Sequence, residues 1–239
     1  MKIAAHRGAS GDRPENTLAA FRRALEQGCR AFECDVRQTK DGELVLSHDP
    51  DLKRTAGVNA EIGARTYAEL ARHDVGAWFG ERFRGERLAR FADLLKLLPP
   101  EVELHVDIKQ AEPPYAGIEG RILRALRERG EWKTRTTFSS TDAATLERLA
   151  AAEDGLRLGY QPRLTPIDEA FSIAERLRPE SLRLNLERLT PDWLTRARAR
   201  DFLVYIYTVN TREDFARMRA LNIDLVFSNY PAMVGAAEL

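Results

Sequence analysis

The sequence has little cysteine and no net charge. Only Cys29 and Cys34 occur in 239 residues, too few for a disulfide framework or a four-cysteine zinc cluster, so a reducing compartment is the simpler expectation. Lys and Arg total 37 and Asp and Glu total 37. Such a chain has no overall field to attract nucleic acid or an acidic membrane surface, so we expect neither as a stable partner.

Long apolar runs and a targeting segment are also missing. No apolar stretch approaches the roughly 20 residues that a membrane helix needs. The first five residues lead directly into His6-Arg7-Gly8, which leaves no room for the apolar core of a signal peptide. We therefore expect a cytoplasmic protein. The hydrophobic share of 44% and the charged share of 31% are typical of a globular protein with a substantial core.

Short apolar runs alternate with amphipathic stretches along the whole chain, which predicts repeated βα units. The expected strands are Ile3–His6, Ala31–Val36, Leu104–Ile108, Thr136–Ser139, Leu156–Tyr160, Ser181–Leu184, Leu203–Thr208 and Leu225–Ser228. The expected helices include Thr17–Gln27, Ile118–Arg129, Asp142–Ala152, Pro166–Leu177, Pro191–Arg200 and Arg212–Leu221. Eight parallel strands in this length predict an α/β fold of the (β/α)₈ TIM-barrel type, with residues 1–239 as one domain. An open doubly wound sheet is the alternative, but no glycine-rich phosphate loop follows the first strand.

One apolar run, Glu43–His48, follows the second strand too closely for a crossover helix. Asp41-Gly42 is a hairpin signal, so we expect this run to fold back antiparallel on the second strand. If these two residues are the whole loop, Asp35 lies opposite His48.

The gap from Asp49 to Glu103 is too long for a simple βα connection. It is rich in glycine and aromatic residues. We expect residues 50–90 to form a small inserted lobe over the C-terminal mouth of the barrel, followed by a returning helix near Phe91–Leu98.

Charged residues and histidines gather at the predicted ends of the first strands, where TIM barrels place their active sites. They are His6, Arg7, Glu33, Asp35, His48, Asp107 and Lys109. The alternation of side chains along a strand puts Glu33 and Asp35 on one face, and likewise Asp107 and Lys109.

This set of residues indicates a chemistry. Three carboxylates form an all-oxygen donor set, which suits Mg²⁺ or Ca²⁺ better than zinc. Arg7 and Lys109 can bind phosphate oxygens, and two histidines can take and give a proton near neutral pH. The residues therefore point to metal-assisted cleavage of a phosphodiester. A purely structural salt-bridge cluster is the alternative, and buried ion networks stabilise weakly.

Ordered motifs along nearly the whole chain resemble the glycerophosphodiester phosphodiesterase family. They are His6-Arg7-Gly8, Pro14-Glu15-Asn16-Thr17, Glu33-Cys34-Asp35-Val36, Thr39-Lys40-Asp41-Gly42, His48-Asp49 and Asp107-Ile108-Lys109, with weaker matches at Phe138-Ser139, Tyr207-Thr208-Val209-Asn210 and Asn229-Tyr230-Pro231. The resemblance implies a barrel with an inserted lobe that hydrolyses glycerophosphodiesters, as small-molecule substrates, to glycerol 3-phosphate and an alcohol. It also implies that a glycerol hydroxyl attacks phosphorus first, which gives a cyclic phosphate that water opens.

The resemblance assigns roles to individual residues. It implies His6 and His48 as the acid–base pair, and Arg7 and Lys109 as phosphate contacts. The implied metal ligands are Glu33, Asp35 and Asp107, with Glu15 in the metal site or beside it. Asn16 is implied to support the substrate site, and Tyr207 to pack on the glycerol end.

Several positions depart from the family pattern. The family usually has Glu at 107, Trp at 207 and Asp at 229, where this chain has Asp107, Tyr207 and Asn229, and its usual Pro-Thr-Leu is replaced here by Ala89-Arg90-Phe91. Two other functions remain open at this point. One is a phospholipase D-like enzyme resembling sphingomyelinase D, and the other is a barrel that binds phosphodiesters without catalysis. The sequence does not predict an oligomeric state.

Overall fold

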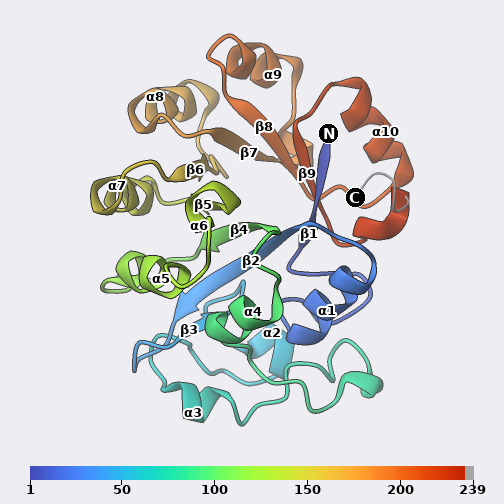
Figure 1. Ribbon diagram of the computed structural model, residues 1–239, viewed down its shortest axis with the longest axis vertical. Coiled ribbons are helices and arrows are strands. Elements are labelled where there is room, and N and C mark those ends of the chain that lie inside the picture. The colour runs from blue at the N-terminus through green and yellow to red at the C-terminus, as the bar shows by residue number, and fades with distance from the viewer. Residues whose placement is uncertain (235–239) are drawn as a thin grey trace.

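The computed structural model describes residues 1–234, and its centre is a closed barrel of eight parallel strands (Figure 1). The barrel strands are β1 (Lys2–His6), β2 (Ala31–Gln38), β4 (Glu103–Ile108), β5 (Thr136–Ser140), β6 (Arg157–Tyr160), β7 (Ser181–Asn185), β8 (Leu203–Tyr207) and β9 (Leu225–Ser228). Each strand pairs in parallel with its neighbour, and the β1–β2 pairing closes the ring. The predicted TIM barrel is confirmed.

Helices surround the barrel (Figure 1). The longer helices are α1 (Leu18–Glu26), α4 (Phe91–Leu97), α5 (Ile118–Leu126), α7 (Ala143–Ala152), α8 (Ile167–Leu177), α9 (Pro191–Arg198) and α10 (Arg212–Ala220). Short elements complete the chain: α2 (Lys53–Ala56), α3 (Tyr67–Leu70), α6 (Trp132–Arg135) and the 3₁₀ turns η1 (Glu81–Phe83), η2 (Leu186–Arg188) and η3 (Pro231–Val234). Among the helices of the described chain, none is long and apolar enough to cross a membrane.

Local sequence signals account for where the helices begin. Thr17, Asp142 and Thr211 each accept a hydrogen bond from a backbone N–H in the first turn of α1, α7 and α10. Such caps satisfy donors that have no partner within the helix. Pro191 is the first residue of α9, where its missing N–H costs nothing. Because Thr17 and Asp142 are caps, α1 and α7 start one residue later than expected, whereas α9 and α10 start at the expected residues.

Two hydrophobic layers hold the barrel together. The larger lies between strands and helices and includes Phe21, Phe32 and Phe138, all fully buried. Inside the barrel, a small apolar cluster contains Tyr205 and Phe227. The interior is not uniformly apolar, because His105, Thr137, Ser181 and Arg183 are also buried there.

The run after β2 forms β3 (Leu44–Leu46), antiparallel to β2 as expected, but the predicted register is wrong by one residue. Gln38 pairs with Leu44 and Val36 with Leu46, and the backbone N–H of Ser47 donates to the carbonyl of Asp35 over 3.1 Å. Ser47, rather than His48, therefore lies opposite Asp35. The cause is a three-residue loop ending in Gly42, whose φ of 84° is left-handed; this loop type follows a type I turn with a glycine in that conformation.

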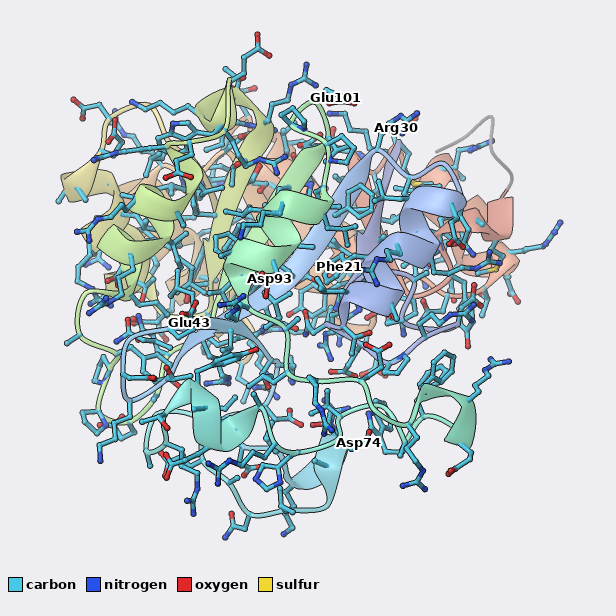
Figure 2. All side chains as sticks on the ribbon, turned by 60° about the horizontal axis from the view of Figure 1, so that its bottom comes forward. Phe21, Arg30, Glu43, Asp74, Asp93 and Glu101 are labelled. Atoms are coloured by element: carbon cyan, nitrogen blue, oxygen red, sulfur yellow. The ribbon has the colours of Figure 1, made fainter. Side chains whose placement is uncertain are left out.

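The segment between β3 and α4 carries α2, α3 and η1 and packs around its own apolar side chains, which include Leu52, Ile62 and Leu70. Figure 2 shows this segment, with Asp74, on the same side of the barrel as Glu43, which directly follows the hairpin loop. Arg30 and Glu101, which precede β2 and β4, lie at the opposite end. The segment thus lies toward the end of the barrel at which β2 and β4 finish.

Candidate active site

A cavity of about 740 Å³ lies at the C-terminal ends of the strands. Its walls contain eight of the ten residues singled out from the sequence: His6, Arg7, Glu33, Asp35, His48, Asp107, Lys109 and Tyr207. The other two, Glu15 and Asn16, lie beside it and contact Arg7 and Asp35. Barrel closure therefore brings together residues that are far apart in the chain.

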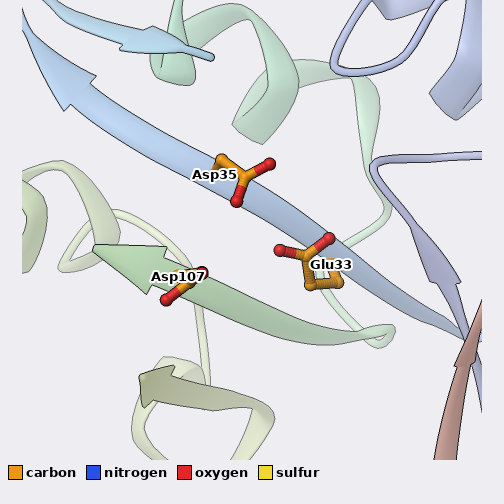
Figure 3. A group of neighbouring side chains, drawn as sticks. All are labelled: Glu33, Asp35 and Asp107. Carbon is orange, nitrogen blue, oxygen red and sulfur yellow. The ribbon is translucent and has the colours of Figure 1, made fainter. Parts of the chain in front are cut away.

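Three carboxylates form the floor of the cavity. Strands β2 and β4 are parallel neighbours in which Asp35 pairs with Asp107 and Glu33 with His105. The three acids have carboxylate oxygens within 4.8 Å of one another, and each residue is at most 4% exposed. Figure 3 shows the side chains of Glu33, Asp35 and Asp107 turned toward one another. Ion-free carboxylates at this spacing repel strongly in a buried site.

Two cations lie against the acids. Lys109 Nζ contacts Asp107 and lies 3.0 Å from Asp35 Oδ1, while Arg7 Nε lies 3.0 Å from the other oxygen of Asp35. The backbone N–H of Arg7 donates to Glu33 over 2.9 Å. Among these five side chains, three negative charges face two positive ones.

Burial and the neighbouring charges shift the pKa values of these acids. Burial, reinforced by Asp35, raises the pKa of Glu33 well above its usual range. Burial alone would also raise the pKa of Asp35, but Lys109 and Arg7 outweigh it and hold that pKa well below the usual range. Two cations thus favour the ionised form of Asp35, while burial and the neighbouring carboxylate disfavour the ionised form of Glu33. The cluster is short of positive charge and can accommodate a further cation.

His6 is the last residue of β1 and projects into the cavity. After it, Gly8 turns the chain with a φ of 80° and packs so tightly on α1 that a Cβ atom would lie 2.6 Å from the backbone of Ala20. His6 Nδ1 lies 2.7 Å from Asn229 Oδ1, an acceptor, so Nδ1 carries the proton and Nε2 is free to accept one. Burial, followed by the charge of Arg7, lowers the pKa of His6 to about 4, so the ring is neutral at pH 7.

His48 follows β3 and has a different environment. Its Nδ1 lies 2.7 Å from the carboxylate of Asp49, which itself accepts from Arg54 Nε over 2.6 Å. Burial lowers the pKa of His48, but Asp35 and the hydrogen bond to Asp49 oppose the shift. The smaller shift leaves His48 the more easily protonated histidine of the two.

Arg54 links the segment after β3 to the site. Besides Asp49 it donates to both oxygens of Glu15, over 2.9 and 2.7 Å, and its guanidinium lies 5.6 Å from the ring centre of Trp78. Glu15 also accepts from Arg7 Nη1 over 2.9 Å. Both oxygens of Glu15 are therefore engaged by arginines.

Asn16 and Tyr207 occupy different parts of the site. Asn16 is 4% exposed, donates to Asp35 Oδ2 over 2.8 Å and accepts from the backbone N–H of Asp35 over 3.3 Å. Its φ of 56° is left-handed, a conformation that asparagine tolerates better than most residues. Tyr207 ends β8 and lines the cavity wall.

Several polar residues of the site were given no role from the sequence. They are Arg54, Ser139, Gln161, Arg183 and Asn229. The inward parity of alternate residues on β5 and β7 is a signal for Ser139 and Arg183. Arg54 has no comparable signal. Asn229 belongs to a motif of the family resemblance, but its contact with His6 depends on loop geometry. His105 is fully buried, with Nδ1 3.2 Å from Arg183 Nη2.

The chain is similar to proteins of one family over nearly its whole length. Residues 6–233 match the glycerophosphoryl diester phosphodiesterase family. A glycerophosphodiester phosphodiesterase of Caldanaerobacter subterraneus subsp. tengcongensis is 31% identical over 232 residues, covering 96% of this chain and 94% of that protein. A probable glycerophosphodiester phosphodiesterase 1 of Mycobacterium tuberculosis is 30% identical and covers 98% and 91%.

Solved structures agree. A phosphodiesterase from Oleispira antarctica, in complex with the product sn-glycerol-3-phosphate, superposes with a TM-score of 0.89 at 26% identity, covering 97% of this chain and 94% of that one. A putative glycerophosphoryl diester phosphodiesterase from Silicibacter pomeroyi has a TM-score of 0.86 at 26% identity, covering 97% and 91%. This chain therefore belongs to the glycerophosphoryl diester phosphodiesterase family.

Proposed function

We propose that this protein is a divalent-metal-dependent phosphodiesterase that hydrolyses small glycerophosphodiesters to glycerol 3-phosphate and an alcohol. One observation carries the proposal: a cluster of three acids and two cations faces two histidines in one cavity. Family membership and the glycerol phosphate bound to the Oleispira protein support the substrate class.

Glu33, Asp35 and Asp107 would hold the metal. Their donor set is all oxygen, which fits Mg²⁺ or Ca²⁺, and the shortage of positive charge around Glu33 fits a divalent cation. When bound, such a cation supplies charge stabilisation for a phosphoryl oxygen. Because both oxygens of Glu15 accept from arginines, we place Glu15 in support of Arg7 rather than among the ligands. The hydrogen bonds of Asn16 to Asp35 give it a similar supporting role.

The histidines would perform the proton transfers. With Nδ1–H directed at Asn229, Nε2 of His6 can take the proton of an attacking glycerol hydroxyl. The attacking glycerol oxygen then bonds to phosphorus, and the bond between phosphorus and the oxygen of the leaving alcohol breaks. Protonated His48 donates a proton to that leaving oxygen. Water then opens the cyclic phosphate with the two roles reversed. Arg7 and Lys109 bind the non-bridging oxygens, and Tyr207 packs against the glycerol end.

Residues 50–90 complete the site in this proposal. They act as a small lobe at the mouth, and Arg54 couples the lobe to the histidine that gives the proton. No nucleic acid or membrane partner is needed for this chemistry, and the cytoplasm is the expected compartment.

The direct test is turnover. Purified protein with Mg²⁺ or Ca²⁺ is expected to convert glycerophosphocholine, glycerophosphoethanolamine or a related diester to glycerol 3-phosphate, followed by ³¹P NMR, and EDTA is expected to stop the reaction. Failure of every diester would contradict the proposal. Tight calorimetric binding of glycerol 3-phosphate without turnover would instead support a binding protein, and cleavage of sphingomyelin alone would support a phospholipase D-like enzyme.

The environment of His6 predicts a pH effect. Asn229 is neutral, so Asn229→Asp would place a carboxylate 2.7 Å from Nδ1 and raise the pKa of His6. A base must be unprotonated, so kcat/KM falls as pH drops through that pKa. The acid limb of the kcat/KM profile is therefore expected to move to higher pH by about one unit. Asn185→Asp is the matched control, because Asn185 lines the same cavity but caps η2. An unshifted limb in Asn229→Asp would argue against His6 as the base.

A further inference from the structure

A buried cation without a carboxylate partner lies beneath the acids. Arg183 on β7 is 2% exposed, and in the described part of the chain no carboxylate oxygen lies within 4.0 Å of its nitrogens. Its Nη1 donates to Ser139 Oγ over 2.8 Å, and Nη2 lies 3.2 Å from His105 Nδ1. A guanidinium has donors only, so both neighbours must accept from it.

This restriction sets the direction of the next hydrogen bond. Ser139 Oγ accepts from Arg183 and also from Gln161 Nε2 over 3.1 Å. Its single proton is then directed at the remaining neighbour, Asp107 Oδ1, at 3.2 Å. Arg183 therefore donates to Ser139 and Ser139 donates to Asp107, and this direction of the hydrogen bonds cannot reverse while the arginine is in place.

Gln161 reinforces the same oxygen. Its Nε2 donates to Asp107 Oδ1 over 2.7 Å, and with two amide protons it can serve Ser139 as well. Gln161 is 7% exposed and Ser139 is fully buried, so water competes little for either bond. Oδ1 of Asp107 thus receives two donors from the barrel side, while Oδ2 contacts Lys109.

Two donors on one oxygen fix the rotation of the Asp107 carboxylate. We propose that Gln161 is a positioning residue, which, with Ser139 held by Arg183, keeps the Asp107 carboxylate oriented toward Glu33 and Asp35 for the divalent cation. The inference rests on the proposed function for the cation, and it assigns a task to three residues that touch neither the acid–base pair nor the other two carboxylates. Hydrogen-bond partners behind a ligand raise metal affinity by fixing its orientation.

The test is cation affinity measured without substrate. Gln161→Met keeps the length of the side chain and removes the amide donor. Titration of metal-free protein with Mg²⁺ or Ca²⁺ alone, by calorimetry, is expected to show about 10-fold weaker binding. Activity is expected to need correspondingly more metal, with kcat largely restored at saturating metal. A merely structural loss would lower the unfolding temperature without this change in metal requirement.

Gln110→Met is the matched control. Gln110 lines the same cavity, but its Nε2 donates to Thr145 over 2.7 Å and does not contact Asp107. Unchanged affinity in Gln161→Met, or an equal loss in Gln110→Met, would overturn the inference. If Gln161→Met does not fold, Ser139→Ala removes the second donor and decides by the same titration. Wild-type protein that binds no divalent cation would overturn the proposed metal site itself, whereas wild-type binding with an unaltered variant would overturn only the role of Gln161.

Discussion

Alanine at His48 or at His6 is expected to lower kcat for glycerophosphodiester hydrolysis by about 10²–10⁴-fold, the usual contribution of a general acid or base. Nε2 of His6 is unprotonated because the proton of the ring is on Nδ1, which donates a hydrogen bond to Asn229 Oδ1. His48 is hydrogen bonded to Asp49, which stabilises its protonated form. In the proposed mechanism each ring serves one half of the proton transfer, so loss of either is expected to slow both steps.

Steady-state kinetics with saturating metal measures this effect. The cation affinity of His48→Ala is expected to stay close to that of wild type, because His48 is not among the three clustered acids. His73→Ala is the control, since His73 does not line the cavity. Variants of His6 and His48 that retain wild-type kcat would show that the histidines do not carry the chemistry.

The second large effect is expected at Asp35. Asp35→Asn keeps the shape of the side chain and removes its charge. We expect divalent-cation affinity to fall by about 100-fold or more, because loss of a direct ligand should exceed the effect of losing a supporting hydrogen bond. The turnover rate at a fixed metal concentration is expected to fall together with the cation affinity.

The same substitution is expected to destabilise the fold. Asp35 is 1% exposed and lies 3.0 Å from both Arg7 Nε and Lys109 Nζ. Removing one member of a buried ion network leaves its partners uncompensated, which costs about 3–5 kcal/mol. Urea unfolding of the metal-free protein measures this cost, and calorimetric titration measures the affinity.

Asp93→Asn is the control for Asp35. Asp93 in α4 pairs with Arg90, the residue before that helix, and neither lines the cavity. Its substitution is expected to leave cation affinity unchanged. Wild-type cation affinity in Asp35→Asn would rule out the carboxylate cluster as the metal site, whatever the change in stability.

The register of β2 and β4 shows how far sequence reasoning reached. Alternation along each strand predicted that Glu33, Asp35 and Asp107 share the inner face, and parallel pairing places Asp35 beside Asp107. In a closed barrel, residues on the inner face at the ends of neighbouring strands lie close together, because all strand ends meet at one rim. The hairpin was harder. A two-residue and a three-residue loop share the signal Asp41-Gly42, and the difference moves His48 out of register with Asp35.

The partners of the site residues depended on packing. Arg54 reaches Glu15 and Asp49 from the segment after β3, and Asn229 reaches His6 across more than two hundred residues. Neither contact follows from spacing or periodicity.

By itself, the sequence determined the barrel, the end at which the candidate site lies, and the acids, cations and histidines gathered there, because periodicity and strand order are local properties. Only the tertiary structure decided which atom faces which. It showed that Asn229 Oδ1 lies beside Nδ1 of His6, that Arg54 donates to Asp49 next to His48, and that Gln161 and Ser139 both donate to one oxygen of Asp107. The physical reason is that hydrogen-bond direction depends on distances of a few ångströms between distant segments, which are set when the barrel closes and its loops pack.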